Sequence, residues 1–252
     1  NKKQILAWTT ALSVLALMPV ESHALTHTGS GTYTNRHGKT GTYKRTVTRQ
    51  KGRVDKTTTI TNAKGKTATK DVTKTYDPTT GQANVTKDFT GPNGNSIDKT
   101  MTYQKTSNGF TAQGTLTGPK GHTVDISQTS THNGNGSRTV DTTYTGPNAK
   151  TLTVDKTITR GDGDRDVTGT YSTSGGKSGS FTSETTKANG QVTTNSTLTN
   201  ANGQTIDRMG VRSVNDGTLT HTVTVTGPNG NTKTWSRSIT PNGSDPDGGG
   251  AH

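Results

Sequence analysis

Few residues of this chain are spaced for bond-making or metal chemistry. The best candidate is the run Asp162, Asp164 and Asp166, three carboxylates at alternate positions, which is how calcium loops begin. Such a loop also needs a glycine at its sixth position and an acidic residue at its twelfth, where this chain has Val167 and Thr173. A calcium site at the three aspartates and a simple acidic turn are the two interpretations, and no other cofactor is indicated.

Catalytic constellations are missing from the sequence after residue 24. The histidines there show no His-x-His or His-x-x-x-His spacing, and the chain has no cysteine, which argues against zinc and excludes thiolate chemistry. Glu184 is the single glutamate of this region, and the aspartates recur in repeated triplets such as Val54-Asp55-Lys56, which indicates surface charge balance. The glycine-rich turns precede strands rather than helices, so they are not phosphate loops. We expect no enzyme.

Binding chemistry is offered by cations that alternate with aromatic rings. In extended strands this alternation predicts one face of Lys, Arg, rings and aliphatics, and an opposite face of Thr and Asp. Amines and rings together suit polyanions such as acidic polysaccharide, lipopolysaccharide or extracellular DNA, whereas modest cross-strand packing kept soluble by lysines is the alternative interpretation. The candidate polyanion-binding residues are Arg45, Lys56, Lys70, Lys87, Lys99, Lys156, Arg208, Arg237, Tyr103 and Trp235.

The elements that position these residues are marked by a turn signature, Thr-Gly-Pro-Asn-Gly and its variants, which returns about every 27 residues. A second series of Asn-Gly and Asp-Gly turns lies halfway between. The pattern predicts an all-β fold, a repetitive antiparallel β-meander of about 15 or 16 strands in a single-layer or widely curled sheet. A β-solenoid is the alternative, because Thr-x-Thr recurs near half the period.

Pairing residues across the turns gives a predicted register. Aliphatic and aromatic residues meet, and several strand glycines face a ring that covers them. The predicted pairs are Leu116 with Val124, Phe89 with Ile97, Tyr144 with Leu152, Leu198 with Ile206, Met101 with Leu116, Tyr33 with Gly41, Tyr43 with Gly31, Tyr171 with Gly179, Phe181 with Gly169 and Tyr103 with Gly114.

Composition and the two ends of the chain indicate what kind of protein this is and where it is located. Only 23% of the residues are apolar and 4% aromatic, with a net charge of +12, which is too little apolar material for a thick core. Residues 1–24 predict a secretory signal peptide, residues 25–240 the hairpin repeat domain, and residues 241–252 a disordered tail. No transmembrane segment follows the signal. We therefore expect a protein that is secreted, periplasmic or on the surface of a bacterium.

Three functional hypotheses follow. The first is an exported envelope or extracellular-matrix scaffold whose basic-aromatic face binds polyanions. The second is a surface protein that self-assembles when its basic face stacks on the acidic face of another copy. The third starts from the regular Thr-x-Thr arrays, such as Thr115-Leu116-Thr117, which resemble those of β-solenoid ice-binding proteins. That resemblance implies a flat lattice of hydroxyl and methyl groups.

Overall fold

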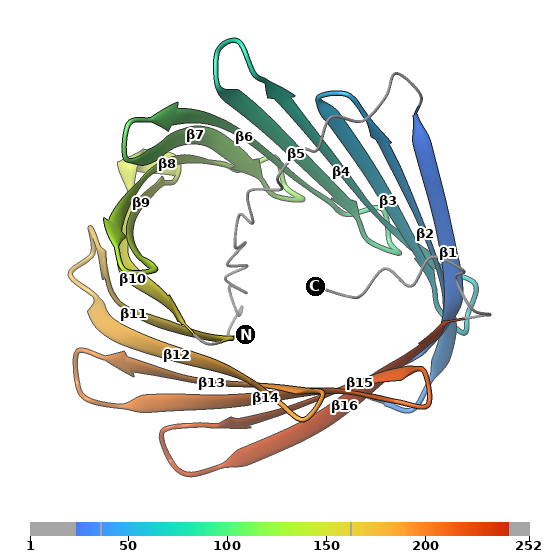
Figure 1. The fold of residues 1–252 in the computed structure, drawn as a ribbon. Helices are drawn as coiled ribbons and strands as arrows, with labels where there is room; N and C mark the ends of the chain where they lie inside the picture. Colours follow the sequence, from blue (N-terminus) through green and yellow to red (C-terminus); the bar gives the residue numbers. More distant parts are fainter. Residues whose placement is uncertain (1–23, 36, 162, 242–252) are drawn as a thin grey trace.

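The computed structural model describes residues 24–35, 37–161 and 163–241, which form a closed barrel of 16 antiparallel strands (Figure 1). A short 3-10 turn, η1 (Pro147–Ala149), precedes β10. The strands are β1 (Leu25–Thr34), β2 (Thr40–Gln50), β3 (Arg53–Thr61), β4 (Thr67–Asp77), β5 (Gln82–Thr90), β6 (Ser96–Thr106), β7 (Gly109–Thr117), β8 (Thr123–Gly134), β9 (Ser137–Thr145), β10 (Thr151–Gly161), β11 (Asp164–Thr173), β12 (Ser178–Ala188), β13 (Gln191–Asn200), β14 (Thr205–Asn215), β15 (Thr218–Thr226) and β16 (Thr232–Pro241).

The predicted fold class is wrong in its main feature, because the sheet closes. Neighbouring strands follow chain order around the barrel, and β16 pairs with β1 through Gly31–Thr34 and Ser238–Pro241. The fold is neither an open or loosely curled meander nor a solenoid of parallel coils. Closure removes the two free sheet edges, which would otherwise invite pairing with other chains.

The predicted signal peptide lies outside the described residues, apart from Ala24 at its end. The same holds for the predicted disordered tail, except that Pro241 is the last residue of β16.

The strand registers fix the width of the barrel. Each neighbouring pair keeps one register, apart from a bulge between His132 and Gly134, so the offsets can be added along one circuit. They amount to a stagger of about 20 residues, which for 16 strands gives a tilt of about 40° and a backbone radius of about 15 Å. Barrels of this width keep an aqueous channel, since side chains do not fill them.

The turn signature forms tight hairpins, as predicted. In the turn after β5, the amide of Gly91 donates to the carbonyl of Asn95 at 2.8 Å, and the amide of Gly94 donates to the carbonyl of Gly91 at 2.9 Å. Gly94 has φ = 77°, a backbone conformation that glycine adopts without strain.

Most of the predicted register is confirmed. Leu116 lies opposite Val124, and the other predicted pairs also form, with two exceptions. Met101 lies opposite Gly114 instead of Leu116, and Tyr103 lies opposite Ala112 instead of Gly114. Both errors come from the position of the turn after β6, whose two central residues are Ser107 and Asn108 instead of Asn108 and Gly109, because Thr106 pairs with Gly109. A slip of two residues leaves every side chain on its predicted face.

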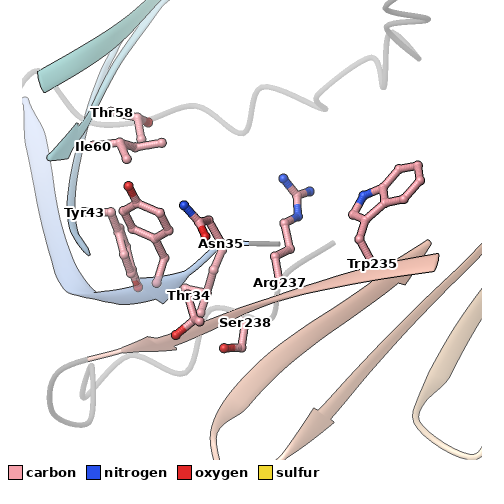
Figure 2. Close-up of a pocket in the computed structure, with 10 residues that line it drawn as sticks. Thr34, Asn35, Tyr43, Thr58, Ile60, Trp235, Arg237 and Ser238 are labelled. Carbon is pink, nitrogen blue, oxygen red and sulfur yellow. The ribbon is translucent and has the colours of Figure 1, made fainter. Parts of the chain in front are cut away.

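Burial identifies which face points inward. In a barrel the inner face is concave, so its side chains crowd one another. The buried side chains share one face by the strand pairing: they are Val85, Met101, Ala112, Ile126, Ser130, Val140, Thr142, Ile158, Val167 and Val223. In Figure 2, Arg237 and Trp235 on this face extend into the barrel, and Ser238 points away. We call this the lumen face and the opposite one the outer wall.

The core is therefore an apolar layer on the lumen side of one arc of the sheet. Met101, Ala112 and Ile126 form one buried cluster, against which Tyr103 and Phe110 pack with ring centroids 5.6 Å apart. Val140, Ile158 and Val167 form a second cluster, covered by Phe181.

Candidate functional site

Charge is segregated between the two faces of the barrel wall, as the register predicted. Within the described strands, every Lys and Arg except Lys44 and Arg53 belongs to the lumen face. Every Asp and Glu of these strands belongs to the outer wall. The lumen is thus strongly cationic, and the described strands contribute no carboxylate to it.

The predicted polyanion-binding residues all lie on the lumen face, but they form separate groups. The first group spans β2 to β6 and consists of Arg45, Lys56, Lys70, Lys74, Lys87 and Lys99. Lys87 lies directly opposite Lys99. Burial, and then the charges of Lys99, Lys70 and Lys74, lower the pKa of Lys87 to about 8.

The second group surrounds Lys156 on β10 and contains three arginines that the sequence analysis missed. Arg160 lies directly opposite Arg165, and Arg138 lies opposite Ile158 on the neighbouring strand. Burial, then the charges of Arg165 and Arg138, lower the pKa of Lys156. The Nε atoms of Arg138 and Arg165 are buried without a hydrogen-bond partner in the described part of the chain. Arg160 and Arg165 flank the turn after β10 symmetrically in the sequence. This spacing could have predicted that they lie opposite each other.

The third group lies on β14, β15 and β16. Arg212, His221 and Arg237 form one cross-strand row, since Arg212 lies opposite His221 and His221 lies opposite Arg237. A β-carbon placed on Gly210 would lie 3.3 Å from Nη1 of Arg208 and 3.4 Å from Nε2 of His221, so both side chains converge over this glycine.

The imidazole of His221 is kept neutral by this surrounding. Burial, followed by the charges of Arg237, Arg212 and Arg208, lowers its pKa to about 4. Its Nδ1 atom is buried and has no hydrogen-bond partner among the described residues. His221 was not among the residues predicted from the sequence, because the row forms only across three strands.

A pocket of about 400 Å³ lies beside this third group, at the seam where β16 meets β1 (Figure 2). Arg237 belongs to both the pocket and the cationic row. The rest of the lining combines the aromatic and aliphatic residues Tyr33, Tyr43, Ile60, Trp235 and Ile239 with the polar residues Thr34, Asn35, Thr58 and Ser238. Of the two aromatic residues predicted to bind polyanions, Trp235 lies beside a cation, Arg237, in this pocket. Tyr103 packs in the apolar core, and burial raises its pKa.

The outer wall carries threonines in cross-strand pairs, for example Thr100 and Thr115, whose Oγ1 atoms are 3.0 Å apart. Arg53 and Asp55 form an exposed ion pair of 2.7 Å on this wall. Aspartates interrupt the threonines in most strands, so the wall has no apolar band of the kind that lipid-embedded barrels carry. Since the threonine array curves around a barrel, the flat lattice implied by the resemblance to ice-binding proteins does not form.

The candidate calcium residues follow β10 in the sequence. Asp164 and Asp166 belong to the outer-wall side of β11, and Asp162 lies outside the described residues. In the described part of the chain, no group of three or more His, Asp or Glu side chains is placed to hold a metal ion. The calcium hypothesis as a whole therefore stays a prediction.

Comparison with family models, with curated proteins and with solved structures finds no match for this chain. Fold and site define the class, a closed barrel of 16 antiparallel strands with a cationic lumen. This strand number is that of porins and is consistent with the bacterial cell envelope, whereas the polar outer wall of the described strands lacks the apolar band that a lipid-embedded porin carries. Over the described ranges, no helix combines the length and apolarity needed to cross a membrane.

The predicted scaffold function is wrong, because closure turns the basic-aromatic face into the wall of a lumen. An extended polymer cannot lie across a surface that is reached only through the barrel ends. Stacking of the basic face on the acidic face of another copy is impossible for the same reason. The predicted combination of cations with aromatic rings is present, but it lines the enclosed lumen of the barrel instead of an open surface.

Proposed function

We propose that this protein is a porin-like barrel of the bacterial cell envelope whose cationic lumen admits and binds small anionic solutes. The observation that carries the proposal is the charge segregation between lumen face and outer wall. Anionic sugars and compact oxyanions are small enough to enter through the barrel ends. A long polymer is not, because most of its length would stay outside the barrel. The proposed ligands are therefore small anions instead of the acidic polymers considered above.

The electrostatics of the lumen support this proposal. A concave wall of one sign of charge focuses its field and raises the local concentration of counter-ions. The screening length at physiological ionic strength is about 8 Å, shorter than the barrel radius yet longer than the gap between neighbouring cations on adjacent strands. Lys87 and Lys99 face each other directly, which destabilises the empty barrel, and an anion between them relieves that repulsion.

Equilibrium binding of a pyrene tetrasulfonate dye tests the proposal. Fluorescence anisotropy is measured against increasing salt, with a cationic dye of similar size as the comparison. The double variant Lys87→Glu/Lys99→Glu reverses two lumen charges. The matched control, Lys64→Glu/Lys120→Glu, makes the same change of net charge at two exposed turn residues.

The expected result is salt-sensitive binding of the anionic dye only, weakened at least tenfold by the lumen variant and less than twofold by the turn variant. Equal binding of the cationic dye, or equal losses in the two variants, would overturn the proposal. Urea unfolding of each variant verifies that the barrel is still folded.

A further inference from the structure

We infer that Arg208, Arg212, His221 and Arg237 form a specific binding site for a phosphate monoester, whose organic group occupies the adjoining aromatic pocket. The inference rests on the proposed function only in that the ligand reaches the site through the lumen. It adds a defined ligand class and a defined place within the barrel.

The geometry collects several oxyanion donors in a small area. Directly opposed residues in an antiparallel sheet have β-carbons about 5 Å apart, so the row Arg212, His221 and Arg237 spans only about 10 Å. Arg208 reaches the same area over Gly210. Guanidinium groups present paired N–H donors that match two oxygens of one phosphate, which lysine ammonium groups do not.

The absence of a side chain at Gly210 makes room for this convergence. Gly210 lies opposite Val223, which is buried and lies opposite Trp235. This second row forms an apolar floor beside the cationic row. A ligand seated here thus meets charge on one side and apolar surface on the other.

The pocket selects the organic part of the ligand. Arg237 extends at its border, next to Trp235, and Tyr43 and Ile60 lie across from them (Figure 2). Tyrosine and tryptophan rings beside a charged group favour a ligand with a planar or apolar organic group over a small hydrated ion. An aryl phosphate combines the two required features.

His221 gives the site a proton-linked response. Nδ1 is buried without a partner within the described ranges, and the ring is neutral because burial, and then the charges of three arginines, lower its pKa. A bound dianion offsets these charges, so ligand binding raises the pKa of His221 by linkage. Neutral imidazole can still donate one hydrogen bond to a phosphate oxygen.

Phenyl phosphate and methyl phosphate are the probes for this site. The chain has two tryptophans, Trp8 and Trp235, so a Trp8→Phe background leaves Trp235 as the only indole reporter. In that background we expect saturable quenching by phenyl phosphate, with an affinity at least tenfold higher than that of methyl phosphate. Arg212→Gln and Arg237→Gln should each weaken phenyl phosphate at least tenfold.

Two further variants separate this site from general lumen attraction. Gly210→Val keeps all the charges but fills the space between Arg208 and His221, and should weaken phenyl phosphate at least fivefold. Lys87→Gln/Lys99→Gln removes two remote lumen charges and should change its affinity less than twofold. Equal losses at both places, or equal affinities for the two phosphates, would overturn the inference.

The outcomes also separate the inference from the proposed function. Normal salt-sensitive dye binding without selective phenyl phosphate binding would refute the specific site alone. Selective phenyl phosphate binding without any preference for the anionic dye would refute the general lumen function alone. Urea midpoints of the arginine and glycine variants verify their folding.

Discussion

Tyr171 on β11 lies directly opposite Gly179 on β12, and its ring occupies the space that a side chain at position 179 would need. A β-carbon built on Gly179 would lie 2.6 Å from the hydroxyl oxygen of Tyr171. Phe181 covers Gly169 on the same two strands, with its Cζ atom 2.6 Å from a β-carbon placed there. Rings lying over glycines supply packing that the scarce aliphatic residues cannot.

Replacing Gly179 with Val should therefore lower the free energy of unfolding by about 1 to 3 kcal/mol, since the new side chain would collide with the backbone carbonyl of Thr199 on β13 as well as with the tyrosine ring. The matched control is Gly29→Ala, also on a lumen-facing strand position, where a β-carbon meets nothing within 4 Å. That control should leave stability unchanged within about 0.5 kcal/mol. Urea denaturation measures both, and a neutral Gly179→Val would contradict the crowding of this position by Tyr171 and the Thr199 carbonyl.

Closure of the barrel can be tested by a disulfide across the seam. Thr34 on β1 lies opposite Ser238 on β16, and opposed Cα atoms in antiparallel strands are about 4.5 to 5.5 Å apart, within disulfide range. The double variant Thr34→Cys/Ser238→Cys should oxidise readily and raise the unfolding free energy by up to about 5 kcal/mol. Because the chain has no cysteine, no competing pair exists.

The control for this closure test is Thr34→Cys/Thr234→Cys, whose second residue lies on the same strand but about 13 Å further along. It should not form an intramolecular bridge. Gel mobility with and without reductant distinguishes the two pairs. An open sheet would bridge neither of them.

The sequence predicted the hairpins, most registers and the separation of charge by face, because these follow from turns and from two-residue alternation. It could not predict closure, since only the four pairs from Gly31 to Thr34 join the ends and no turn connects them. For the same reason it could not assemble the site. Arg212, His221 and Arg237 stand on three strands, and inward curvature is what brings them together with the pocket residues of β2 and β3.

His221 predicts a loss of stability in acid. Its pKa is about 4 in the barrel and about 6.5 in an unfolded chain, so unfolding takes up a proton between these values. The contribution of His221 is fully present above about pH 6.5 and disappears as the pH falls through 4. In His221→Gln, the proton uptake on unfolding near pH 5 should fall by about one proton per molecule. Urea unfolding at several pH values measures this, and identical slopes in both proteins would contradict the assignment.

Lys87 predicts that anion binding weakens in base. Its pKa of about 8 means that raising the pH through 8 removes a lumen charge, whereas ordinary lysines keep theirs to about 10. Affinity for the pyrene tetrasulfonate dye should therefore decline between pH 7 and 9 by roughly threefold to tenfold. Lys87→Arg stays charged throughout this range and should flatten the profile, and Lys87→Gln should start low and change little. An unchanged decline in Lys87→Arg would show that another group carries the titration.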